Sequence, residues 1–292
     1  MPQHASPLLR RPVLLAGAAC GVVGALAAGL LLYDASAGGT SRPATRPAPD
    51  AAPRVVPPAA DAPFDYQIGG PYRPAAKVRA VSRDRAAKPV RGLYNVCYVN
   101  AFQAQPDELR WWQSKHPDLL LKDAAGRPVV DEDWNEVLLD TSTADKRERL
   151  AAIVGGWIKG CAASGFQAVE PDNLDSYDRS KGLLRQSDNA AFARLLARRS
   201  HAAGLAIGQK NTAEMLGRRT TIGFDFAVAE ECGRYDECGA FAKAYRDRVF
   251  VIEYRNADFA KSCRIWGEHL SIVRRDVDVR PKGAPGYRYA SC

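Results

Sequence analysis

Eight short apolar segments, rich in β-branched and aromatic residues, recur along the chain, and each of them ends in polar or charged residues. One of these segments, residues 249–252, has no polar alternation, which is typical of a strand covered on both faces in a parallel sheet. We therefore predict eight strands, over residues 64–68, 78–81, 94–99, 166–169, 205–207, 224–229, 249–252 and 270–273.

Helical patterns lie between the later segments. Residues 143–163 place apolar side chains at a period of 3.6, and Ser142 and Asp145 are spaced as a capping box at the start of this helix. Two further helices are expected, one beginning near Asp188 and one over residues 257–266.

Strands that alternate with helices, to a count of eight strands, predict an α/β protein with a (β/α)8 TIM-type barrel. The first crossover is too short for a full helix, so we expect the barrel to be irregular there. A doubly wound open sheet is the alternative fold, but no glycine-rich phosphate loop follows any of the predicted strands.

The N-terminal segment predicts export. Arg10 and Arg11 precede an uncharged apolar stretch over residues 12–33, and Ala-Ser-Ala at 35–37 fits a cleavage site. We expect residues 1–37 to be a signal peptide. Because the apolar stretch is longer than most signal cores, an uncleaved anchor is the alternative.

Composition separates the rest of the chain into two parts. Residues 38–62 consist mostly of Ala, Pro, Thr, Ser and Arg, which predicts a disordered linker, and residues 63–292 form the predicted barrel domain. The protein is thus expected to be secreted, or tethered to a membrane through residues 12–33. We expect a monomer that contacts a membrane only through an uncleaved N-terminal segment.

Six cysteines follow the apolar stretch, and an even count in an exported chain indicates three disulfides. Cys232 and Cys238 are close enough in sequence to close one loop. Six cysteines allow fifteen connectivities, and in one of those that contain this pair Cys292 ties the C-terminal tail to Cys263, which leaves Cys97 with Cys161. Neither a CxxC nor an HxxxH spacing occurs, so we predict neither a metal site nor another cofactor.

The chain is basic, with a formal net charge of +8, but its Lys and Arg residues are scattered singly and form no run interleaved with aromatic residues. Nucleic acid is therefore not an expected partner.

The active site of a (β/α)8 barrel lies at the C-terminal ends of its strands. Many carboxylates follow the predicted strands, although the chain is basic. Together they would attract a cationic ligand, and a pair of them is what glycoside hydrolysis requires. Tyrosine and tryptophan there offer flat surfaces for sugar rings. The candidate substrate-binding residues are Tyr66, Asp84, Asp133, Trp134, Glu170, Asp175, Lys210, Asn211, Glu231, Tyr235 and Glu253.

A structural interpretation competes with this one, because Asp and Glu at strand ends often serve as helix N-caps. The acidic run at residues 131–133 fits a solvated loop equally well. Glu170, Asp172 and Asp175 are different: three acids within six residues after a buried strand repel one another, which favours a functional role.

Several motifs together resemble a known family. They are FDYQIGG at 64–70, CYVNAF at 97–102, EPDNLD at 170–175, GQKNT at 208–212 and AEECGRYDEC at 229–238. In this order, they are similar to the bacterial branch of the endo-α-1,4-polygalactosaminidases, glycoside hydrolase family 114, over residues 63–292. The resemblance implies a (β/α)8 barrel that cleaves α-1,4-linked galactosamine polymers internally, so the expected partner is a cationic amino-sugar polysaccharide.

The resemblance also implies the catalytic residues. The family's D-N-x-D motif places one acid on Asp172, and its E-x-C motif places the other on Glu230. Glu170 departs from the family, in which an apolar or small residue is common at that position. We expect Glu230 to be the general acid/base and Asp172 the nucleophile or water-activating base, or the two with their roles exchanged.

The neighbours of these acids have expected roles of their own. Asp175 and Glu231 would tune the two pKa values or bind an amino group, and Lys210 and Asn211 would orient a carboxylate and a sugar hydroxyl. The alternative function is a non-catalytic barrel that binds a cationic cell-wall or biofilm polysaccharide, because the same acids would serve binding.

Overall fold

The structure is a computed structural model that describes residues 54–292. The predicted signal or anchor segment and the linker up to residue 53 lie outside the described residues. Within the described part, no helix is both long enough and apolar enough to cross a membrane.

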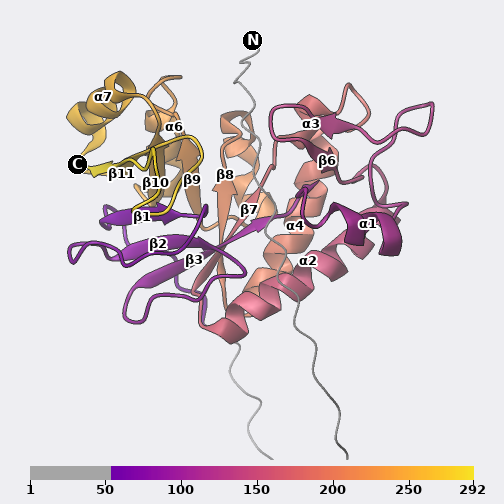
Figure 1. The fold of residues 1–292 in the computed structure, drawn as a ribbon, viewed down its shortest axis with the longest axis horizontal. Coiled ribbons are helices and arrows are strands. Elements are labelled where there is room, and N and C mark those ends of the chain that lie inside the picture. The colour runs from indigo at the N-terminus through magenta and orange to yellow at the C-terminus, as the bar shows by residue number, and fades with distance from the viewer. Residues whose placement is uncertain (1–53) are drawn as a thin grey trace, which may run out of the picture. The chain divides into compact units, whose positions relative to one another are not determined.

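Eight parallel strands form one curved sheet, in chain order, and a ninth strand pairs antiparallel with the last of them (Figure 1). The eight segments predicted from apolar patterning correspond one to one with the eight parallel strands, so the barrel prediction is confirmed. The strands are β1 (Phe64–Gln67), β2 (Ala80–Asp84), β3 (Tyr94–Asn100), β7 (Ala168–Asp172), β8 (Ala206–Lys210), β9 (Phe226–Glu230), β10 (Val249–Glu253), β11 (Ser271–Arg275) and the antiparallel β12 (Tyr289–Ser291).

Side chains close the barrel between β1 and the C-terminal strands, where the described residues form no strand pairing. The Tyr289 hydroxyl donates to the Phe64 carbonyl at 2.8 Å. The guanidinium of Arg275, which is fully buried, lies 3.9 Å from the carboxylate of Asp65. A hydrogen bond and a buried ion pair of side chains therefore connect β1 to the C-terminal strands, in place of backbone hydrogen bonds between strands.

Alternation along each strand divides its side chains between two cores. One set fills the barrel interior, where the rings of Phe64 and Phe250 stack with centroids 4.2 Å apart. The other set packs against the surrounding helices. Because both faces are covered, the strands read as nearly continuous apolar segments.

The helices cover the outside of the barrel (Figure 1). All three predicted helices are present, within one to two residues of their expected starts. The four longest helices are α2 (Ala144–Ser164), α4 (Gln186–Ala202), α6 (Cys238–Tyr245) and α7 (Asn256–Trp266).

The cap of α2 differs from the predicted box of Ser142 and Asp145. Thr143 is the N-cap, and its hydroxyl accepts from the Lys146 amide at 3.3 Å. Ser142 is instead turned toward Asp140, to which its hydroxyl donates at 2.5 Å and its backbone amide at 3.0 Å. Asp145 is used by an ion pair with Arg149. In α4, by contrast, Asp188 does accept from the backbone amide of Arg185 in a capping box.

The irregular part of the barrel is larger than predicted. Within the described residues neither the β1–β2 nor the β2–β3 crossover contains a helix. A long excursion between β3 and β7 contains β4 (Gln103–Ala104), α1 (Leu109–Lys115), β5 (Val130–Asp131) and β6 (Glu136–Leu138), whose strands form a small antiparallel sheet. The remaining short elements are α3 (Ser176–Arg179), the 3-10 turn η1 (Ala213–Arg218) and α5 (Arg219–Ile222).

Three disulfides connect the six cysteines in the predicted pairs. Cys97–Cys161 ties β3 to α2, Cys263–Cys292 ties α7 to the C-terminus, and Cys232–Cys238 closes the loop between β9 and α6. Disulfides persist in oxidising compartments, so all three agree with an extracellular location.

The last part of the predicted linker, residues 54–62, lies against the barrel. The Tyr94 hydroxyl donates to the Val56 carbonyl at 2.8 Å. Most of this segment, together with Arg79, Tyr94 and Arg248, lines a cavity of about 480 Å³.

Candidate active site

A buried lysine and three carboxylates meet at the C-terminal ends of neighbouring strands. Lys210 is the last residue of β8, and its side chain is 2% exposed. Its Nζ lies 3.1 Å from Glu170 Oε1, 3.0 Å from Asp172 Oδ1 and 3.3 Å from Glu230 Oε2. Burial opposes the charge on Lys210, but the three carboxylates outweigh it and raise the pKa of Lys210 well above its ordinary value. This lysine is therefore held as an ammonium ion.

Glu170 lies deepest in this group and has no exposed surface. Its Oε1 accepts hydrogen bonds from the Tyr66 hydroxyl at 2.8 Å and from Lys210, and its Oε2 accepts from the Ser82 hydroxyl at 2.7 Å. Burial raises the pKa of Glu170, while Lys210 and the two hydroxyls act against this rise. We call Tyr66, Ser82, Glu170 and Lys210 the inner cluster.

Asp172 is the last residue of β7, and its side chain is 17% exposed. It accepts from the Tyr98 hydroxyl at 2.7 Å and from the Asn173 amide at 2.9 Å. Burial acts to raise the pKa of Asp172, but the charge of Lys210 and these hydrogen bonds outweigh it, so the pKa lies below its ordinary value. Asp172 is therefore an ionised carboxylate with a solvent-facing side.

Glu230 is the last residue of β9, and its side chain is 23% exposed. Its two oxygens have different partners: Oε1 accepts from the Tyr254 hydroxyl, and Oε2 accepts from the Asn211 amide at 3.1 Å. The Asn211 side-chain oxygen in turn accepts from the Glu230 backbone amide at 2.8 Å. These contacts fix the orientation of the carboxylate at the barrel mouth.

The residues that follow these strands explain how the carboxylates are presented. Asn173, Asn211 and Glu231 all have left-handed backbone conformations, with φ of 68°, 47° and 55°. Asparagine tolerates this conformation better than most residues. The backbone conformation therefore explains the asparagine in D-N-x-D and in Q-K-N. Each turn bends the chain sharply after the strand, and the side chain before it remains at the mouth.

Glu136 is a fourth carboxylate near Asp172, and the sequence did not indicate it. It lies on β6, and its Oε2 accepts from the amides of Asn100 at 2.7 Å and Asn173 at 3.4 Å. Burial, with the nearby charges of Asp172 and Asp131, raises the pKa of Glu136 to about 7. The antiparallel excursion therefore brings an additional acid to the mouth.

The other predicted substrate-binding residues are divided between the mouth and its surroundings. Tyr66 and Lys210 belong to the inner cluster, and Asn211 contacts Glu230. Asp84, at the end of β2, accepts from the Ala86 amide at 2.8 Å, and Asp175 forms an ion pair with Arg179 at 2.8 Å.

Four predicted residues lie on loops outside the inner cluster, and we call them the outer loop residues: Asp133, Trp134, Glu231 and Tyr235. Trp134 is 56% exposed and Tyr235 is 46% exposed. Asp133 is exposed as well, and Glu231 pairs with Arg234 at 2.9 Å.

Glu253 also ends a strand, but it faces away from the inner cluster. It is fully buried at the end of β10, where its Oε1 accepts from the Gly233 amide at 2.7 Å and from the Ser262 hydroxyl at 2.9 Å. A Cβ on residue 233 would collide with both side chains, so glycine is required there. In this position Glu253 supports the loop after Glu230 and does not reach the mouth.

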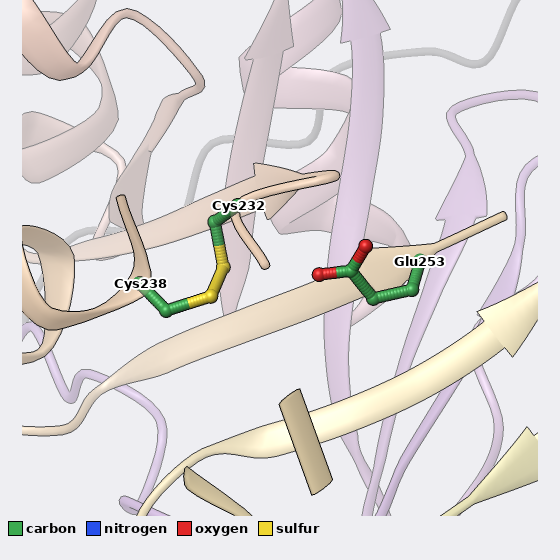
Figure 2. A group of neighbouring side chains, drawn as sticks. All are labelled: Cys232, Cys238 and Glu253. Atoms are coloured by element: carbon green, nitrogen blue, oxygen red, sulfur yellow. A yellow bond between two sulfur atoms is a disulfide. The ribbon is translucent and has the colours of Figure 1, made fainter. Parts of the chain in front are cut away.

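The carboxylate of Glu253 points toward the Cys232–Cys238 disulfide (Figure 2). One ligand atom from each of the three residues lies within 4.8 Å of the others, close enough to consider a metal ion. Metal-binding cysteines are thiolates, however, and the disulfide leaves neither sulfur in that form. With the disulfide formed, this group is a support for the loop.

Sequence similarity adds a family to this geometry. A family model for glycoside-hydrolase family GH114 matches residues 44–292. The chain belongs to glycoside-hydrolase family GH114. It is therefore a glycoside hydrolase, as the motifs predicted, and the two carboxylates at its mouth are of the residue types that such enzymes use. None of the curated protein sequences matches the chain.

Two solved structures share the fold of this GH114 chain. Ega3 of Aspergillus fumigatus, in a complex with galactosamine, is 21% identical, with a TM-score of 0.65, over 82% of this chain and 98% of Ega3. The glycoside hydrolase domain of PelA from Pseudomonas aeruginosa is 17% identical, with a TM-score of 0.54, over 76% of this chain and 96% of that domain. At these identities the likeness establishes a common barrel.

Besides Glu136, three residues of this GH114 site were not predicted from the sequence: Ser82, Tyr98 and Tyr254. Each of them donates to one of the carboxylates through a hydroxyl. Strand alternation contains a signal for Tyr98, because it lies two residues before Asn100 on the inward side of β3. The other two required the register of neighbouring strands.

Proposed function

We propose that this glycoside hydrolase is a secreted, endo-acting enzyme that cleaves α-1,4-linked galactosamine-containing polysaccharide, with Asp172 and Glu230 as its catalytic carboxylates. The observation that carries the proposal is their geometry. They are the partly exposed acids at the ends of β7 and β9. One oxygen of each acid contacts the buried ammonium group of Lys210.

This shared lysine limits the separation of the two acids. Because Nζ of Lys210 lies 3.0 Å from Asp172 Oδ1 and 3.3 Å from Glu230 Oε2, these two oxygens are at most about 6.3 Å apart. Retaining glycosidases hold their carboxyl groups about 5–5.5 Å apart, whereas inverting enzymes leave about 6.5–9.5 Å for a water molecule. The limit on these two oxygens admits the retaining separation, and we propose a retaining mechanism.

In the first step, an oxygen of Asp172 would bond to the anomeric carbon as the glycosidic C–O bond breaks, and Glu230 would give its proton to the leaving oxygen. In the second step, water would attack the anomeric carbon, Glu230 would take a proton from it, and Asp172 would leave as a carboxylate. The lowered pKa of Asp172 supports its assignment as the nucleophile.

The charge of the mouth supports a cationic substrate. Glu136 and Asp172 add to Glu230 there, and ammonium groups of galactosamine would bind such a surface through charge-assisted hydrogen bonds. The galactosamine bound by Ega3, which shares this fold, agrees with that choice. Trp134 and Tyr235, which are largely exposed, would stack on sugar rings farther along the polymer, next to Asp133 and Glu231.

The test is an incubation of the full chain with partly deacetylated α-1,4-galactosamine polymer. New reducing ends and the oligomer ladder are followed by mass spectrometry. We expect a ladder that disappears in Asp172→Asn and in Glu230→Gln. Asp145→Asn is the control, because it removes an exposed acid of α2 that lies outside the mouth, and it should keep activity within a few-fold.

Two results would contradict this proposal. Asp172→Asn with activity within a few-fold of the wild type would remove the assigned nucleophile. Unchanged polymer length, together with tight binding that is lost at high salt, would support a non-catalytic barrel that binds a cationic polysaccharide.

A further inference from the structure

The buried acid Glu170 has no part in the two-carboxylate mechanism described above. We propose that Glu170 is a positioning residue, a buried counter-charge that keeps Lys210 from neutralising Asp172 and so preserves Asp172 as a nucleophile. The proposal rests on the proposed function, because it concerns the efficiency of that same reaction.

The ammonium group of Lys210 lies almost equally close to three carboxylates. Nζ of Lys210 lies 3.1 Å from Glu170, 3.0 Å from Asp172 and 3.3 Å from Glu230. At the low effective dielectric of a buried site, a lysine with fewer partners would pair more strongly with those that remain. Glu170 therefore takes up part of a charge that would otherwise act on the catalytic acids alone.

The second argument is the hydrogen bonding of Glu170. Both of its oxygens accept: Oε1 from Tyr66 and Lys210, and Oε2 from Ser82. Lysine is a donor only, and the two hydroxyls can direct their protons toward the carboxylate. This arrangement satisfies the ionised form, in which both oxygens are acceptors.

The third argument is that Glu170 cannot touch a substrate. It has no exposed surface and lies beneath Lys210 and Tyr66. Its influence on the reaction must therefore be electrostatic and should alter kcat more than KM. Other titratable or charged groups also face this site: Tyr66 of β1, Tyr98 of β3, Glu136 of β6, Arg179 of α3, Glu230 of β9 and Tyr254 of β10.

Protonation of Glu170 provides a test of its charge, because a role in packing alone would not make the effect of Glu170→Gln on kcat depend on pH. Burial raises the pKa of Glu170, so this buried acid gains a proton more readily than an ordinary glutamate as the pH falls. Protonated Glu170 has the shape and neutrality of glutamine. In Glu170→Gln we therefore expect kcat on the galactosamine polymer to fall about tenfold at neutral pH, with the wild-type and variant profiles converging at acidic pH.

The matched pair Glu170→Asp and Glu170→Asn repeats this comparison of an ionisable side chain with a neutral one, using side chains that are one methylene shorter. The aspartate variant should show the same decline of kcat toward acidic pH as the wild type, and the asparagine variant should lack it. Ser82→Ala is the control for packing, because it removes one hydrogen bond and leaves the charge. Circular dichroism verifies that each variant is folded.

Every outcome decides the proposal. A wild-type to Glu170→Gln ratio that is constant across pH, or within twofold at neutral pH, would overturn it. Loss of folding in both Glu170→Gln and Glu170→Asn would assign Glu170 to stability alone and would also overturn it. An inactive wild type is a separate result, because it would refute the proposed hydrolase activity itself.

Discussion

The inner cluster and the outer loop residues each contain a glutamate and a tyrosine, and the two tyrosines lie in contrasting environments, whereas Glu231 is itself only 20% exposed. In the inner cluster a glutamate, a lysine and a tyrosine from different strands are no more than 2% exposed and bind one another. Among the outer loop residues, Trp134 and Tyr235 are about half exposed. Buried charges act on each other at low dielectric, whereas exposed charges are screened by water and salt.

The difference shows that counting acids after the strands does not measure the charge available to a substrate. Glu170, within β7, and Glu253, at the end of β10, are both without exposed surface. Asp172 and Glu230 lie between the two environments, since each has one side on Lys210 and a partly exposed surface. This intermediate position suits groups that must react with a substrate and still be held in place.

The largest effect should come from the two proposed catalytic acids, Asp172 and Glu230. Asp172→Asn and Glu230→Gln remove the proposed nucleophile and acid/base, and each should lower kcat by about 10³-fold. Single-turnover release of oligomers measures this loss. Glu231→Gln changes an outer loop residue. An equal loss of kcat in this variant would show that the outer loop residue matters as much to the reaction as the two acids, and would contradict the comparison.

Lys210→Met tests whether the inner cluster depends on its charge balance. The substitution keeps an unbranched side chain, one heavy atom shorter, but leaves Glu170, Asp172 and Glu230 without their shared cation. We expect it to lower the free energy of unfolding by about 3–5 kcal/mol at pH 7, as measured by denaturant titration. The loss should shrink at acidic pH, where the carboxylates take up protons.

Arg149→Met is the surface counterpart of this variant. Arg149 pairs with Asp118 at 2.5 Å, and both side chains are about half exposed. Water and salt screen exposed ion pairs, so this variant should be nearly as stable as the wild type. Similar losses for Arg149→Met and Lys210→Met would show that burial does not distinguish the two pairs.

Glu136→Gln tests the acid that the excursion brings to the mouth. Burial raises its pKa in the folded protein to about 7, above the ordinary value of 4.5, so the unfolded chain ionises first as the pH rises. Wild-type stability should therefore fall between pH 4.5 and 7 and stay lower above it, whereas glutamine does not titrate. The variant should be more stable by about 1–3 kcal/mol above pH 7 and equal to the wild type below pH 4.5. Thermal unfolding at several pH values measures this difference, and a constant difference would contradict it.

Trp134→Ala should have a small effect on stability and a moderate one on substrate binding. The side chain is 56% exposed, so the free energy of unfolding should change by less than about 0.5 kcal/mol. If its ring stacks on sugar, KM for the polymer should rise about three- to tenfold, with kcat nearly unchanged. A folded variant with wild-type KM would remove Trp134 from the proposed binding surface.

Much of the fold could be predicted from local patterns, because apolar segments such as Val249–Ile252 are long enough to specify strands without distant contacts. The helix ending at Gly165, the number of disulfides and the Cys232–Cys238 pair could be predicted too, but the pairing of the other four cysteines is decided by the tertiary structure. The cap of α2 could not, because Ser142 and Thr143 are equivalent in sequence until Asp140 binds the first of them.

The sequence by itself determined which acids follow which strands, since chain order places Asp172 and Glu230 at strand ends. Only the tertiary structure decided which acids face one another. A shift of one residue moves a strand side chain to the opposite face, so strand patterns alone do not separate Glu170, inside the barrel, from Glu253, behind it. Glu136 reaches Asp172 through a long excursion, and Lys210 joins three carboxylates only because parallel strands end at one mouth. Those charges interact through space, and their distances are set by register and closure of the barrel.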